Sequence, residues 1–161
     1  MSDSALYEAC KAAKPDELAA LLDQPGAKDL LSKPQPPVGL CPLHVACGAD
    51  RTEKPGTGGL ITPEHVRCAE LLLDAGADPN VTADSDWRPI HYAAIRGSPE
   101  LVKLLIERQA DAAAKNAGGW SGYALANKHG HAEAARLCAE AGASKASIGA
   151  RIAAKIGFAH W

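Results

Sequence analysis

Residues 86–97 read DWRPIHYAAIRG, and residues 119–130 repeat this pattern imperfectly as GWSGYALANKHG. The two segments begin 33 residues apart, and the apolar residues that follow each of them keep the same offset. A fixed period of that length is typical of a stacked array, because a single unit cannot bury its apolar face without a neighbour. The sequence therefore predicts a short solenoid.

The repeated unit resembles the ankyrin repeat. That family's pattern is a Gly, then Thr-Pro-Leu-His, an Ala-Ala pair, Gly-His, a Val/Leu-rich helix, and Gly-Ala-Asp with Asn two residues on. It is matched by PLHVAC at 42–47 and LLLDAGADPN at 71–80, and again by PIHYAA at 89–94 and LLIERQAD at 104–111. The resemblance implies an all-α ankyrin-repeat solenoid of about four helix pairs with β-hairpin-like loops and a C-terminal helix.

We expect one ankyrin-repeat domain over residues 1–143 and a C-terminal helix over 144–161. The expected repeats are 4–38, 39–85, 86–118 and 119–143. The second is longer than one period, since 47 residues separate His44 from His91. We place the surplus in an insertion at 49–62, which is polar and rich in Gly.

The composition bounds the class of protein. The chain has 161 residues and a formal net charge of -2, which gives no general attraction to nucleic acid or membranes. It has no apolar run of about 18 residues and no secretory pattern at its N-terminus, so we expect an intracellular, cytoplasmic protein without a membrane span. Five cysteines without a Cys-x-x-Cys spacing predict buried, reduced thiols.

The sequence carries no recognisable active site. It lacks the Gly-x-Ser-x-Gly, His-Glu-x-x-His and Gly-x-Gly-x-x-Gly patterns. His44 and His91 occupy the family's Pro-Leu-His position, where imidazole resembles a hydrogen-bonding brace for a turn. His129 and His131 have no carboxylate or thiol beside them, so they make a weak metal site. We predict that the protein is not an enzyme and needs no metal or cofactor.

The expected function is the recognition of another protein. The ankyrin resemblance implies a concave groove formed by the hairpin tips and the outer side of each first helix. Trp87 and Trp120 occupy equivalent hairpin positions, and Trp, Tyr and Arg often dominate interface energies. Basic residues around them suggest a partner with an acidic segment, while packing of the indole rings between hairpins is the alternative. The predicted partner-binding residues are Leu40, Trp87, Arg88, Tyr92, Ile95, Arg96, Lys115, Trp120, Lys128 and His129.

The last residues of the chain change in character. Residues 143–161 contain no Asp or Glu, and isoleucines recur there at every fourth position. Such a helix either covers the exposed face of the last repeat or docks a partner. The candidate contacts in the docking case are Ile148, Ile152, Ile156, Phe158 and Trp161.

Two further hypotheses follow from the resemblance. Asn80 is similar to hairpin asparagines of ankyrin repeats that an iron- and 2-oxoglutarate-dependent hydroxylase modifies, or it is a turn residue that bonds its own backbone.

The chain itself is expected to be an adaptor or scaffold, either a monomer or a subunit of a hetero-complex. The alternative is a permanent structural subunit of a large assembly, with the 50–62 insertion and the C-terminal tail as clamps.

Overall fold

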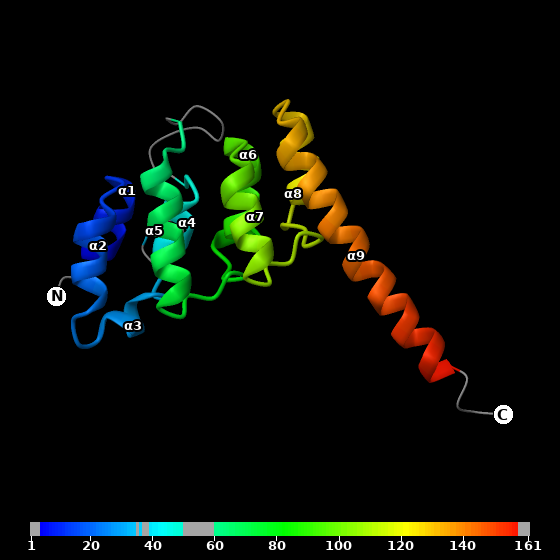
Figure 1. The fold of residues 1–161 in the computed structure, drawn as a ribbon, viewed down its shortest axis with the longest axis horizontal. Helices are drawn as coiled ribbons and strands as arrows, with labels where there is room; N and C mark the ends of the chain where they lie inside the picture. The colour runs from blue at the N-terminus through cyan, green and yellow to red at the C-terminus, as the bar shows by residue number, and fades with distance from the viewer. Residues whose placement is uncertain (1–3, 35, 37–38, 50–59, 158–161) are drawn as a thin grey trace.

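The computed structural model describes residues 4–34, 36, 39–49 and 60–157, with side chains up to residue 144. It is an all-α array in which short helices stand side by side in a row, ending in one long helix (Figure 1). The helices are α1 (Ala5–Lys11), α2 (Pro15–Leu22), α3 (Ala27–Leu30), α4 (Pro42–Ala46), α5 (Pro63–Asp74), α6 (Pro89–Arg96), α7 (Pro99–Glu107), α8 (Gly122–Lys128) and α9 (Ala132–Gly157), with a 3₁₀ turn η1 (Asp84–Asp86).

The helices form four pairs, α1/α2, α4/α5, α6/α7 and α8/α9. First helices contact first helices along the row, as α1 with α4 and α6 with α8, and second helices contact second helices, as α5 with α7 and α7 with α9. The predicted stacked all-α solenoid is therefore confirmed. Within the described residues no strand forms, although Leu40 lies in a β-bridge and Lys115 and Ser121 form an antiparallel bridge with each other.

Proline and glycine set where the helices begin and end. Each of α2, α4, α5, α6 and α7 starts with proline, whose missing N–H costs nothing in the first turn. Gly97 ends α6 with φ 67°, a left-handed conformation that glycine adopts without steric cost. The chain can then turn at once into α7, which keeps the pair compact.

One continuous hydrophobic cluster runs along the array. Its largest fully buried side chains are mostly leucines, while alanines at the helix contacts let the backbones approach closely. All five cysteines are buried and unpaired, which confirms the prediction of reduced thiols in the core. In the part of the chain that the structure describes, no helix is long and apolar enough to cross a membrane.

The last helix differs from the expected arrangement. α9 runs through the predicted boundary at residue 143 without a break, because Gly142 lies within the helix and is not left-handed. Its C-terminal part leads away from the row of helices instead of folding back over the last repeat (Figure 1). The side chains of Ile148, Ile152 and Ile156 lie outside the described residues, as do Phe158 and Trp161 entirely.

The predicted insertion at 49–62 is described only at its ends. Ala49 is buried and Ile61 packs against the core, so both ends of the segment are attached to the array. Residues 50–59 lie outside the described part, and the insertion remains a prediction there.

Candidate protein-binding surface

Buried histidines fix the loops that carry the candidate surface. The Nδ1 atom of His44 accepts the backbone N–H of Cys41 at 3.1 Å. Its Nε2 atom therefore carries the proton and donates to the carbonyls of Val81 at 3.1 Å and Trp87 at 3.2 Å. Burial lowers the pKa of His44 to about 4, so the ring stays neutral at pH 7. His44 thereby holds the loop before the third repeat.

His91 does the same one repeat later. Its Nδ1 accepts the N–H of Arg88 at 3.0 Å, and its Nε2 donates to the carbonyl of Ala114 at 3.0 Å. Burial lowers the pKa of His91 as well. The prediction that these two histidines brace turns is confirmed, and each one braces the loop that leads into the following repeat.

Trp87 packs against its own helix. Its ring lies 5.2 Å from that of Tyr92 and 5.8 Å, edge-on, from that of His91. Tyr92 in turn meets His44 edge-on at 5.8 Å, and burial raises the pKa of Tyr92 to about 12. The half-buried indole is part of an aromatic cluster that joins the second and third repeats.

Trp120 occupies the equivalent position but is 40% exposed. The Asn116 side-chain oxygen accepts the N–H groups of Trp120 and Gly118, both at 3.0 Å, so the loop beneath the ring is held in place. The ammonium group of Lys128 lies 4.6 Å from the ring centroid, a cation–π contact. The place of Tyr92 is taken by Leu125, and this leaves the indole without an aromatic neighbour on the helix.

The four predicted basic contact residues differ in how far they are engaged by the array itself. Arg96 donates from Nε to the Gly48 carbonyl at 2.8 Å and so ties the third repeat to the second. Arg88 is half-buried, while Lys115 and Lys128 are exposed. Within the described residues none of these four cations forms a salt bridge. These cations are therefore not ion-paired among the described residues.

Three of the predicted contact residues are less exposed than a partner-binding role requires. Leu40 is 2% exposed and Ile95 is 5% exposed, because both side chains pack into the hydrophobic cluster between repeats. We therefore leave them out of the proposed surface. His129 is half-buried and its ring stacks on His131 at 6.4 Å.

The rings of His129 and His131 belong to the packing between the third and fourth repeats. His131 bonds through Nε2 to the carbonyl of Ile95 at 2.9 Å, which engages one ring nitrogen in packing. Across the described residues, no group of three or more His, Cys, Asp or Glu side chains could hold a metal ion.

Asn80 bridges two repeats. Its side-chain oxygen accepts the N–H of Asp111 at 2.7 Å, and its amide donates to the carbonyl of Gln109 at 3.0 Å. The side chain therefore bonds the backbone of the next repeat, and not its own turn as the simpler interpretation expected. Hydroxylation of Asn80 remains a prediction that mass spectrometry of the native peptide can test.

Sequence reasoning missed Tyr123. It is exposed on α8, although its equivalents Leu43 and Ile90 are among the most deeply buried residues of the array. The signal was available, since the fourth repeat is the last in the periodic pattern and the described residues contain no further repeat that packs on it.

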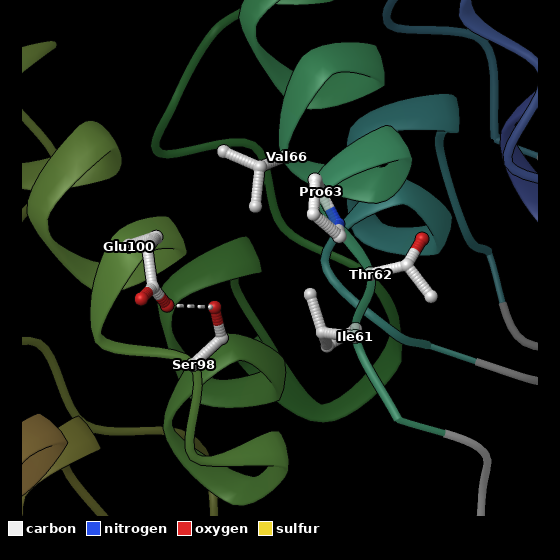
Figure 2. A pocket seen from close by; sticks show the side chains of 6 residues that line it. All are labelled: Ile61, Thr62, Pro63, Val66, Ser98 and Glu100. Atoms are coloured by element: carbon white, nitrogen blue, oxygen red, sulfur yellow. Dashed lines mark hydrogen bonds between the residues drawn. The ribbon is translucent and has the colours of Figure 1, made fainter.

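An open cavity of about 310 Å³ lies between the first turns of α5 and α7 (Figure 2). Its lining residues are Ile61, Thr62, Pro63, Val66, Ser98 and Glu100. The Ser98 hydroxyl donates to Glu100 at 3.2 Å and accepts the N–H of Leu101 at 3.3 Å as the cap of α7. The Ser98 hydroxyl serves here as the cap of α7, and the cavity is an open groove between two helix ends.

Comparison with known proteins agrees with this architecture. A model of ankyrin repeats in three copies matches residues 62–148, and a model of a single ankyrin repeat matches residues 38–84. Human ankyrin repeat and SOCS box protein 16 is similar, with 32% identity over 91% of this chain and 30% of the relative. Inversin of Canis lupus familiaris is 35% identical over 43% of this chain and 6% of the relative.

A third relative is the ankyrin repeat, SAM and basic leucine zipper domain-containing protein 1 of Equus caballus, 34% identical over 60% of this chain and 18% of the relative. The chain thus spans less than a third of the length of each of these relatives. The repeats and the relatives support a protein–protein interaction module in general. From the matches over residues 38–148 and the stacked helix pairs, the chain belongs to the ankyrin repeat family.

Proposed function

We propose that this chain is a non-enzymatic adaptor or scaffold that binds a protein partner through its loop tips and first helices, with Trp120 as the anchor. The observation that carries the proposal is an exposed indole on a loop held by Asn116. A large apolar ring is costly to leave in water, and a loop that is already ordered loses little entropy on binding.

The charge around Trp120 supports an acidic partner segment. Lys115 and Lys128 are exposed, and neither has a salt-bridge partner among the described residues. Carboxylates on a partner would complement this charge and accelerate association. Trp87, Arg88, Tyr92 and Arg96 border the surface as half-buried residues and shape it more than they contact the partner.

A quantitative affinity purification from the native source tests this proposal. Trp120→Ala should lower the recovery of specific co-purifying proteins about tenfold or more, since an anchor typically contributes about 2 kcal/mol. Lys103→Ala, an exposed position on α7, serves as the matched control and should leave recovery unchanged. Equal recovery with all three proteins would contradict the proposal.

A permanent structural subunit is the second candidate, and the projecting part of α9 is the observation that favours it. In that case the 50–62 segment and the tail would act as clamps in an assembly. Sedimentation and limited proteolysis distinguish the two: an adaptor remains monomeric with an intact tail, whereas an isolated subunit aggregates or loses its tail. A cytoplasmic location belongs to both proposals, because five unpaired thiols suit a reducing compartment.

A further inference from the structure

The first turn of α5 has no counterpart in the later repeats. α5 and α7 end 33 residues apart, at equivalent positions, yet α5 has 12 residues and α7 has 9. α9 starts at Ala132, which is again 33 residues after the start of α7 at Pro99. In this register the second helix of a repeat begins at Val66, and residues 63–65 are an additional turn of α5.

A histidine holds this additional turn. The Nδ1 atom of His65 accepts the backbone N–H of Thr62 at 3.2 Å, and the Thr62 hydroxyl lies 3.0 Å from the same nitrogen. The pair forms a capping box in which imidazole takes the place of the usual Glu or Gln. Ser98 stands at the position of His65 one repeat later, and its hydroxyl caps α7 directly by accepting the N–H of Leu101 at 3.3 Å. A helix pair therefore packs into the array when its second helix starts one turn later.

The additional turn depends on a neutral ring. A proton on Nδ1 of His65 would remove the acceptor for the Thr62 N–H, and it would place positive charge in the first turn of a helix, where the dipole disfavours it. Burial lowers the pKa of His65; the carboxylate of Glu64 opposes this effect and the guanidinium of Arg96 adds to it. Residues 63–65 contain no fully buried side chain, so little packing would oppose the loss of the turn.

The helices packed against α5 contribute further titratable groups. These are Cys10 of α1, Lys14, Asp16 and Glu17 of α2, Cys47 of α4 and Glu100 of α7. Burial raises the pKa of both thiols, so they stay uncharged at pH 7.5 and below. Histidine is the side chain whose ordinary pKa lies between pH 5 and 8, so His65 is the group here that titrates in that range.

We propose that His65 is an acid-sensitive switch whose protonation unwinds residues 63–65 and lets α5 begin at Val66. The two states are the long form of the helix seen in α5 and the short form seen in α7. Ile61, Thr62 and Pro63 provide three of the six residues that line the groove between α5 and α7, so the change remodels this groove (Figure 2).

The direction of the pH dependence follows from the two forms. In the unwound form His65 regains its ordinary pKa of about 6.5, which is higher than its pKa in the capped turn. The capped turn is therefore fully favoured above pH 6.5 and is progressively lost as the pH falls below that value. Trp120 belongs to another repeat, so the loop surface takes no part in this switch.

Hydrogen exchange of the full 161-residue chain at pH 7.5 and pH 5.0 tests the switch. Protection factors are compared, since they remove the intrinsic pH dependence of exchange. The N–H groups of Val66 and Arg67 should lose protection about tenfold at pH 5.0. Their equivalents in α7 by distance from the helix start, Val102 and Lys103, should keep it, because the Ser98 cap does not titrate.

Two variants and one titration complete the test. His65→Gln keeps a capping box without a titrating ring and should retain protection at both pH values. His129→Gln makes the same change in the fourth repeat and should leave the tenfold loss at Val66 in place. Circular dichroism and the melting temperature at pH 7.5 establish that both variants fold. In the unaltered chain the ring of His65, followed by NMR, should titrate below pH 6.5.

Four results would overturn the assignment of the switch to His65. They are protection at Val66 and Arg67 that does not change with pH, an equal loss in His65→Gln, a ring that titrates at or above pH 6.5, and an equal loss at Val102 and Lys103. The last result would mean that acid loosens the whole array and not the first turn of α5.

Discussion

His44 links the stability of the fold to pH through a single ring. Its pKa is lowered from about 6.5 to about 4 by burial, so the unfolded chain binds more protons than the folded chain between these values. The stabilising contribution is therefore complete above pH 6.5 and is lost as the pH falls towards 4. We expect the free energy of unfolding, measured in urea, to drop by about 2 kcal/mol from pH 7.5 to pH 5 because of this group.

His44→Gln is the control for that dependence. Glutamine keeps one donor and one acceptor but does not titrate, so the variant should be less stable at pH 7.5 and lose most of the pH slope. His91, whose pKa is also lowered, leaves a smaller residual slope. An unchanged slope in the variant would mean that His44 is not the titrating group.

The two equivalent tryptophans should respond differently to truncation. Trp87→Ala removes a ring that packs on Tyr92 and His91 and should lower the free energy of unfolding by about 2 kcal/mol. Trp120→Ala removes a more exposed ring and should change the free energy of unfolding by less than about 0.5 kcal/mol. Thermal and urea unfolding measure both, and equal losses would contradict the assignment of one brace and one anchor.

At the scale of the elements, Gly97 and Gly130 offer a matched pair at the ends of α6 and α8. Both are left-handed, with φ 67° and φ 78°, so alanine should strain either position by about 1 kcal/mol. A Cβ atom on Gly97 would also overlap the ring of His131, whereas nothing approaches one on Gly130. We expect Gly97→Ala to destabilise by at least about 2 kcal/mol more than Gly130→Ala in urea unfolding.

Removing the obstructing ring provides a second check. In the double variant Gly97→Ala, His131→Ala the overlap is gone, although the bond to the Ile95 carbonyl is lost too. The two changes should therefore be less costly together than the sum of their separate effects. Strictly additive effects would place the cost of Gly97→Ala in its backbone conformation alone.

At the scale of the whole molecule, the role of α9 beyond the array can be decided by truncation. A chain ending at Ser144 lacks residues that project from the row of helices (Figure 1). We expect its melting temperature to change by no more than about 2 °C, because an isolated helical extension adds little stability. A fall of about 8 °C or more would mean that residues 145–161 cap the fourth repeat.

The sequence predicted the repeats and their braces but not which side chains are exposed. The 33-residue period and the Pro-Leu-His positions were sufficient for the stacked helices and for the role of His44, since local pattern dictates both. Trp87 and Trp120 look equivalent in an alignment of repeats. Their exposure differs because Trp87 packs on Tyr92, whereas the fourth repeat has Leu125 at that position. The contact between Trp87 and Tyr92 is seen only in the structure.

The continuous last helix could not be predicted from the repeat pattern either. Gly142 matches the helix-ending Gly76 in sequence, yet only Gly76 takes the left-handed conformation. A glycine permits a helix to end but does not force it to, and the alanine-rich residues around Gly142 suit a helix. The helix therefore continues through the predicted boundary at residue 143.

Three side chains bond from one repeat towards the next, whereas Arg96 and His131 bond back to carbonyls of the preceding repeat. His44 reaches into the loop before the third repeat, and His91 and Asn80 reach into the backbone that follows α7. The fourth repeat has Ala124 where the second and third repeats have His44 and His91, so α8 lacks the equivalent brace. Local opening should therefore be most frequent in the fourth repeat. In a hydrogen-exchange experiment, deuterium should enter the amides of α8 before those of α6.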